Sequence, residues 1–177
     1  MTCFARSLLA AIVLPLAGCP LLAVEAEVGE VCVTYKDIAI EGVPTGDHVQ
    51  HSFRTDDLGQ LKELAAQDAE LAFTHVVVRA HGSGVPSVSS AHVTVASGDP
   101  ESTLPTLSIV ECSGDCVSDG FTLDIPAGIQ QSALEYVQTG SLVVDLDLRG
   151  QLPIEAWTAD VDVCMTGKFS YVLDPSN

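Results

Sequence analysis

Apolar and polar residues alternate along most of this chain, and this alternation limits the available folds more than any other feature. Val31, Val33 and Tyr35 alternate with Cys, Thr and Lys, and similar alternation recurs at 76–81 and 144–149. A period of two places alternate side chains on opposite faces of a β-strand, one buried and one solvated. Further strand-like runs lie at 49–54, 91–97, 106–111, 121–125, 158–165 and 168–173. About nine short strands, most of them separated by Gly, Pro, Asp or Ser clusters, predict an antiparallel β-sandwich or an open barrel.

One segment departs from this two-residue period. Leucines and alanines recur at helical spacing over 57–72, and Thr55 or Asp56 is available to cap a helix that starts there. Helical spacing gathers these apolar side chains on one face, which a helix buries against its neighbours. We therefore expect one amphipathic helix near 57–72, packed on an edge or an end of the sheet.

A second, shorter helix is expected near 133–138. Ser132 and Glu135 match a capping box, in which the two side chains satisfy free backbone N–H groups at a helix start. Gly140 follows the segment and can end a helix, because glycine accepts the left-handed conformation that helix ends often require. The predicted fold class is thus mainly β with one or two short helices.

Size and charge exclude several classes of protein. The chain has 177 residues, of which 47% are hydrophobic and 18% charged, so it can bury a core and is not globally disordered. Its net charge of −17 repels phosphate groups, and binding nucleic acid requires a basic surface that this composition does not provide. We expect no nucleic-acid partner.

The first twenty residues have the pattern of an export signal. Arg6 precedes an apolar run over 8–14, which is shorter than the roughly 20 residues that a membrane-spanning helix needs. Small residues follow, and the tetrad Leu16-Ala17-Gly18-Cys19 resembles the lipobox of bacterial secreted lipoproteins. The resemblance covers only this signal; the rest of the chain resembles no family that we can name.

The lipobox resemblance implies a membrane anchor. In that family the signal is removed before the cysteine, so Cys19 would become the first residue, carry a diacylglycerol thioether and usually an N-linked acyl chain such as palmitate. Pro20 stands where many inner-membrane lipoproteins have Asp, which favours the outer membrane. The alternative is ordinary cleavage after Ala23 or Ala26, which would discard Cys19 and release a secreted, soluble protein.

These expectations divide the chain into three parts. Residues 1–18 are the lipoprotein signal peptide, residues 19–30 a lipidated tether and residues 31–177 a single β-rich domain. No internal repeat and no linker long enough to separate two domains interrupts the last part.

The cysteines indicate disulfide bonds. Cys3 leaves with the signal and Cys19 carries the lipid. Four cysteines remain for the domain: Cys32, Cys112, Cys116 and Cys164. An even number in an exported chain suggests two disulfides, with three possible connectivities. We favour Cys32 with Cys164, near the two ends of the domain, and Cys112 with Cys116, across a Ser-Gly-Asp turn. Zinc held by four thiolates is disfavoured because the C-x-x-C spacing is missing.

Two aspartate pairs are the candidates for a metal site. Asp145 and Asp147 share one strand face, as do Asp160 and Asp162, because both pairs have i, i+2 spacing. If the two strands were neighbours, four carboxylates would gather, and calcium binds through carboxylate and other oxygens. The alternative is that these residues form the solvated face of an acidic protein.

Other chemistry-bearing residues form no complete motif. The segment His81-Gly82-Ser83-Gly84 is similar to the H-G-G-G oxyanion loop of some α/β-hydrolases, but no G-x-S-x-G nucleophile motif accompanies it. A glycine-rich turn after a strand is the simpler interpretation. The histidines are expected to pair with carboxylates across the sheet; they are His48, His51, His75, His81 and His92.

Together these patterns predict a non-enzymatic, lipid-anchored protein of the cell envelope. Its disulfide-linked β-sandwich would face a partner protein or an envelope polymer, with no cofactor. Two alternatives from other classes are a calcium-dependent binding module and a small secreted hydrolase, because a hydrolytic acid and base need only two suitably spaced carboxylates in a cleft.

Overall fold

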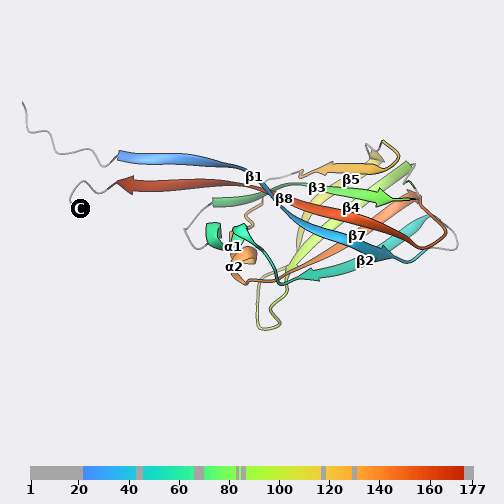
Figure 1. Ribbon diagram of the computed structural model, residues 1–177, viewed down its shortest axis with the longest axis horizontal. Coiled ribbons are helices and arrows are strands. Elements are labelled where there is room, and N and C mark those ends of the chain that lie inside the picture. The colour runs from blue at the N-terminus through green and yellow to red at the C-terminus, as the bar shows by residue number, and fades with distance from the viewer. Residues whose placement is uncertain are drawn as a thin grey trace, which may run out of the picture.

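The part of the chain that the structure describes forms two four-stranded antiparallel sheets and two short helices (Figure 1). The computed structural model describes residues 22–42, 46–65, 70–82, 84, 87–116, 119–128 and 131–173. The elements in chain order are β1 Leu22–Ile40, β2 His48–Thr55, α1 Gln60–Ala65, β3 Glu70–His81, β4 Ser87–Ser97, β5 Leu107–Cys116, β6 Thr122–Pro126, α2 Leu134–Gln138, β7 Leu142–Gln151 and β8 Trp157–Leu173.

The order of the strands defines the topology. Sheet A has the order β1-β8-β3-β6 and sheet B the order β2-β7-β4-β5. Strand β1 thus pairs with β8, β2 with β7, β3 with β6, and β4 with β5. In these four pairs the described strands form one long antiparallel hairpin, with β4–β5 at its tip. The hairpin is wrapped, so that β8 also pairs with β3 and β7 also pairs with β4. Eight strands in this arrangement form a double-sheet jelly roll.

Alternation builds the core between the sheets, as expected. On β7 the inward residues Val144, Leu146 and Leu148 are buried, and so are the inward residues of β8, which are Ala159, Val161 and Val163. The residues between those of β7 are partly exposed on the outer face. The prediction of an antiparallel β-sandwich is confirmed.

The predicted strands at 158–165 and 168–173 are one continuous strand, β8. The expected break lies at Gly167, which instead pairs with Val28 of β1 on one side and Leu71 of β3 on the other. Ladder hydrogen bonds on both sides keep the backbone extended where a local pattern suggests a turn. The described residues accordingly form eight strands and not about nine.

The predicted helix over 57–72 is much shorter in the structure. Helix α1 covers only Gln60–Ala65, residues 66–69 lie outside the described part, and β3 already begins at Glu70. Leu71 is buried within β3, where it pairs with Gly167. Pairing with β8 therefore overrides helical spacing in the last part of the predicted segment.

The second helix is confirmed, but the predicted capping box is wrong. Helix α2 covers Leu134–Gln138, its N-cap residue is Ala133, and no side chain caps it. The Ala133 N–H donates to the Leu71 carbonyl, so the start of the helix is tied to β3. Gly140 does end the helix: it has a φ of 82° and its N–H donates to the Val137 carbonyl.

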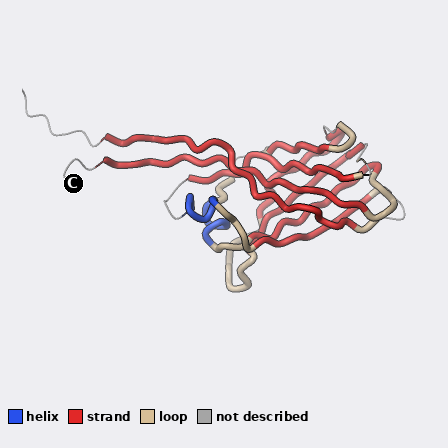
Figure 2. The backbone as a smooth tube through the Cα atoms, viewed as in Figure 1, coloured by secondary structure: helices blue, strands red, loops and turns tan. Residues whose placement is uncertain are grey.

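The first and last strands extend beyond the sandwich as a two-stranded ribbon (Figure 2). Pairs from Leu22 with Leu173 to Ala26 with Phe169 lie past the last β8–β3 pair, Glu70 with Lys168. At a rise of about 3.4 Å per residue this ribbon is roughly 17 Å long. From Leu22 onward, the segment expected to be a tether is thus paired β-strand. Among the described residues, no helix has the length and apolarity needed to cross a membrane.

Candidate functional site

Chemistry-bearing side chains gather on the outer face of sheet A. Because inward positions of β3 and β8 form the core, the residues between them point outward. We call this set the polar face: Glu30, Cys32 and Asp37 of β1, His75, Arg79 and His81 of β3, and Asp160, Asp162 and Cys164 of β8. Strand β8 lies between the other two strands, since it pairs with β1 on one side and with β3 on the other.

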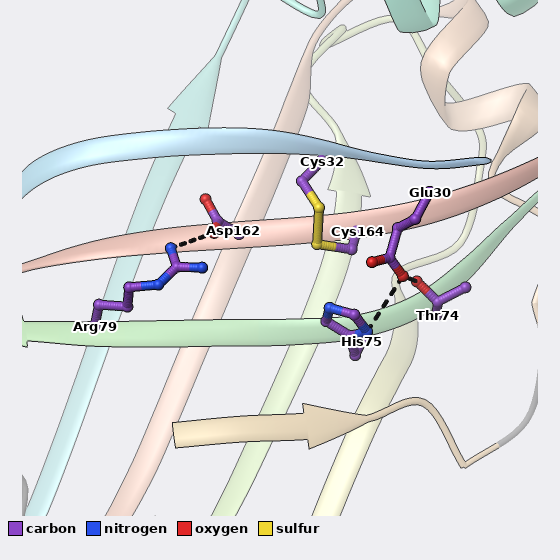
Figure 3. The surroundings of a disulfide bond; sticks show 7 residues. All are labelled: Glu30, Cys32, Thr74, His75, Arg79, Asp162 and Cys164. Carbon is purple, nitrogen blue, oxygen red and sulfur yellow. Dashed lines mark hydrogen bonds and ion pairs between the residues drawn. A yellow bond between two sulfur atoms is a disulfide. The ribbon is translucent and has the colours of Figure 1, made fainter. Parts of the chain in front are cut away.

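A disulfide between Cys32 and Cys164 lies on the polar face (Figure 3). The two cysteines are directly opposite each other in the β1–β8 register, which brings their side chains together without a turn. Cys32 is exposed, whereas Cys164 is only 1% exposed. This is the pairing favoured from the sequence.

The second favoured disulfide, Cys112–Cys116, is also present. It lies within strand β5, where an isolated turn was expected. The register steps from Val88 with Cys116 to Ser90 with Ser113, so β5 carries one extra residue there. The bond therefore closes a β-bulge.

His75 and Glu30 lie beside the Cys32–Cys164 bond (Figure 3). Glu30 Oε1 accepts a hydrogen bond from Thr74 Oγ1 at 2.8 Å and lies 3.4 Å from His75 Nδ1. A ring nitrogen of His75, a carboxylate oxygen of Glu30 and the sulfur of Cys164 are all within 4.8 Å of one another. A sulfur, an imidazole and a carboxylate thus form one cluster, and the disulfide bond to Cys32 leaves Cys164 no free thiolate to bind a metal.

An ion pair between a buried aspartate and an exposed arginine adjoins the disulfide. The Asp162 side chain is only 9% exposed and pairs with the guanidinium of Arg79. Its Oδ1 atom has no hydrogen-bond partner among the described residues. A buried carboxylate is tolerated when a cation pairs with it, so Arg79 serves the stability of this face.

Asp37, His81 and Asp160 form a second group at the other end of the polar face. Asp160 Oδ1 accepts a hydrogen bond from the Asp37 N–H at 2.9 Å and lies 3.1 Å from His81 Nε2. Asp37 has a φ of 52° at a register shift of β1. One imidazole nitrogen and two carboxylate oxygens, mutually within 4.8 Å, are a donor set suited to a divalent transition metal.

Asp160 should contribute to stability in a pH-dependent way. The Asp37 backbone N–H, followed by the His81 hydrogen bond, lowers the pKa of Asp160 below its usual value. A carboxyl group with a lowered folded-state pKa stabilises the fold above its unfolded-state pKa of about 3.9, and this contribution is lost as pH falls through the folded-state value. We expect Asp160→Asn to be less stable than the wild type at pH 7 and to approach it as pH falls through the lowered folded-state pKa of Asp160. Urea unfolding between pH 7 and pH 2.5 measures this; a constant difference would contradict it.

The structure does not bring the four candidate aspartates together. Asp145 and Asp147 lie on β7 in sheet B, whereas Asp160 and Asp162 lie on β8 in sheet A. The chain passes from sheet B to sheet A between β7 and β8, so the outward side chains of these two strands face opposite sides of the sandwich. Asp147 instead contacts His48 Nε2 at 3.1 Å.

The histidines follow the expected pairing in part. Three of them lie next to a carboxylate, namely His48, His75 and His81. His92 Nε2 instead lies 2.9 Å from Ser108 Oγ, and His51 stacks against Phe53. Among the described residues His92 makes no ion pair, so the Ser108–His92 pair lacks the acid that orients the base in a nucleophilic triad.

The other sequence candidates are simple to place. His81 is the last residue of β3, and Gly82 with a φ of 79° turns the chain away from the strand. Cys19 and Ser83 lie outside the described residues. Sequence reasoning missed Glu30 and Asp37 as members of the polar face. No local pattern identifies them, because Glu30 meets His75 only across the intervening strand β8.

No protein-family model and no curated protein sequence matches the chain. Among solved structures, it is similar to one of turnip yellow mosaic virus, with a TM-score of 0.36 and 13% identity over 98% of this chain and 95% of that one. Desmodium yellow mottle tymovirus gives a TM-score of 0.35 with 12% identity, over 97% and 99% of the two chains. Black queen cell virus gives 0.21 with 10% identity, over 99% and 87%. The jelly-roll topology of this chain is defined by its own strand order.

Proposed function

We propose that this chain is a lipid-anchored protein of the bacterial cell envelope, most consistent with the outer membrane. Its jelly-roll domain is non-catalytic, stands off the membrane on the β1–β8 ribbon, and exposes the outer faces of its sheets to a partner protein or an envelope polymer. The lipid is attached at Cys19.

The position of the ribbon is the observation that supports this proposal. Strand β1 begins at Leu22, three residues after Cys19, and Leu22 pairs with Leu173 at the end of the ribbon away from the sandwich. A lipid on Cys19 therefore places this end of the ribbon at the membrane. Two or three acyl chains, at about 0.8 kcal/mol per buried methylene, are sufficient for stable attachment.

The charge of the chain fits a domain held at a distance. A net charge of −17 is repelled by anionic headgroups. The ribbon's length of roughly 17 Å is about twice the Debye length of about 8 Å at physiological ionic strength. Most of this repulsion is therefore screened at the sandwich, while the lipid holds the end of the ribbon.

The anchor is tested by replacing Cys19. In cells fed labelled palmitate, the wild-type protein is expected to carry label and to sediment with membranes. Cys19→Ala is expected to lose the label completely and to leave the outer-membrane fraction. Cys3→Ala is the matched control, because Cys3 lies in the segment that is removed. The Cys3→Ala protein should therefore remain labelled. Label on the Cys19→Ala protein would contradict the proposal.

The partner is tested separately in intact cells. A photo-crosslinking residue is placed at an outward position of each sheet, for example at Thr34 in sheet A and at Gln50 in sheet B. A specific adduct from one face and not the other identifies the binding face. Failure of both faces to capture any protein or polymer would count against the interaction, while leaving the anchor intact.

A further inference from the structure

We propose that Cys32–Cys164 is an exchangeable disulfide, at which an external thiol attacks the sulfur of Cys32 and Cys164 departs beside His75. The attacking group is a thiolate from a small thiol such as glutathione or from a cysteine of another protein. This goes beyond a lipid-anchored binding domain, because it assigns a site of covalent modification to the polar face.

Access favours attack at Cys32. This residue is exposed and lies on β1, which is one of the two edge strands of sheet A among the described strands. A shallow cavity of about 220 Å³ borders it, between Thr34 of the same strand and the segment Asp57–Gly59. A thiol can therefore approach Cys32 from the side of β1 that no strand of sheet A covers.

The direction of attack selects the same sulfur. A thiolate must approach along the S–S axis, opposite the sulfur that leaves. The bond runs from β1 to β8 (Figure 3), so the line beyond Cys32 passes over the free edge of the sheet. The line beyond Cys164 runs toward β3, where His75 is its direct partner in the register. Cys164 is also buried, so it is the leaving group and not the target.

His75 assists the departure of Cys164. A thiolate released in a buried position is costly unless a cation or a proton reaches it. The imidazole of His75 lies within 4.8 Å of the Cys164 sulfur, and Glu30 Oε1 lies 3.4 Å from its Nδ1 atom. General-acid help from a positioned imidazole increases rates by about 10²–10⁴ in enzymes.

The reaction balances with thiols alone. In the first step a bond forms between the external sulfur and Cys32 Sγ, and the Cys32–Cys164 bond breaks. The electron pair of that bond goes to Cys164, which takes a proton from the imidazolium of His75, and water reprotonates the ring. A second thiolate then attacks the external sulfur, which releases Cys32 as a thiolate and forms the oxidised external disulfide. Two thiols supply the two electrons.

The second disulfide provides an internal control. Cys112 and Cys116 pack against the hydrophobic core, and their bond lies in sheet B, away from His75. A substitution that acts through the chemistry at His75 changes the opening of one bond only. A substitution that merely loosens the whole domain changes both.

The experiment uses the purified full-length protein in detergent. The folded protein is incubated with reduced glutathione, free thiols are trapped by alkylation at set times, and the modified peptides are identified by mass spectrometry. We expect the glutathione adduct on Cys32 and the first free thiol on Cys164. His75→Gln is expected to slow this opening about tenfold or more, with no change at Cys112–Cys116. His48→Gln is the matched control, since His48 also contacts a carboxylate, that of Asp147, but lies in sheet B; this variant should leave both rates unchanged.

Three results would overturn the proposal. They are an adduct on Cys164, equal rates in the wild type and His75→Gln, and equal slowing of both disulfides in His75→Gln. If His75→Gln does not fold, Glu30→Gln replaces it, because glutamine still accepts the hydrogen bond from Thr74 while the charge is lost. That variant is expected to slow the opening of Cys32–Cys164 severalfold and to leave Cys112–Cys116 unaffected; an unchanged rate ratio would equally overturn the proposal.

Discussion

Replacing both Cys32 and Cys164 with alanine is expected to lower the free energy of unfolding by about 3–5 kcal/mol. The two cysteines are 132 residues apart, so their bond restricts most of the unfolded chain. The chain-entropy model assigns about 5 kcal/mol to a loop of this length, and measured losses are often smaller. Cys164 is also buried, so its truncation leaves a small cavity that adds to the cost. The lost restriction of the unfolded chain and the cavity both lower the free energy of unfolding.

The matched control replaces the other pair, Cys112 and Cys116. These residues are only 4 apart, and the same model assigns about 2 kcal/mol to their bond. Urea unfolding of both double variants, each with the other disulfide intact, gives the two losses under identical conditions. Equal losses would contradict the interpretation that loop length sets the difference. This comparison measures how much the Cys32–Cys164 bond stabilises the fold, whereas the glutathione experiment measures how fast the bond opens.

Gly150→Ala is expected to cost about 2–4 kcal/mol, although it adds a single methyl group. Gly150 of β7 has a φ of 145°, a conformation that residues with a Cβ rarely adopt. A Cβ there would also collide with the backbone of β4, at the carbonyl oxygen of Ser87 and near Val88. Backbone atoms of a paired strand cannot rotate away, so the pairing of β4 with β7 must shift. Thermal and urea unfolding measure the loss.

Gly29→Ala is the control for this substitution. Gly29 also lies in a strand, β1, but nothing lies within 4 Å of the position that a Cβ would occupy. Removing backbone freedom from the unfolded state should leave the stability unchanged or raise it by about 0.4–1 kcal/mol. A similar loss in both variants would mean that glycine in a strand is generally required here, and would contradict the role assigned to close approach at Gly150.

Much of the fold follows from local patterns. The two-residue period identified segments of all eight described strands, because it reports directly which residues of an extended chain face a core. The pattern was least reliable where one strand meets two neighbours. Gly167 is typical of a turn, yet pairing on both sides keeps it within β8. Leu71 fits the helical spacing, but it lies in β3. Local signals carry no information about such neighbours.

The candidate site was less predictable than the fold. The observed cysteine pairs are the ones favoured, among three possible connectivities, from positions near the ends of the domain and from short spacing. Glu30, by contrast, is a single acidic residue in an acidic chain, and only the placement of β8 between β1 and β3 brings it to His75. The hypothesis of four gathered aspartates depended on β7 and β8 being neighbours, and the crossing from sheet B to sheet A separates them.

The amino-acid sequence by itself thus determined that this chain forms antiparallel strands around an apolar core, with four cysteines available for two bonds. These properties depend on the period of the residues and on their number, which are local. Only the tertiary structure decided which outward residues meet: Cys164 with His75, Asp160 with His81, and Asp147 with His48 rather than with Asp160 or Asp162. The physical reason is that strand order arises from how the whole hairpin wraps to bury both apolar faces, and residues far apart in the chain become neighbours only through that wrapping.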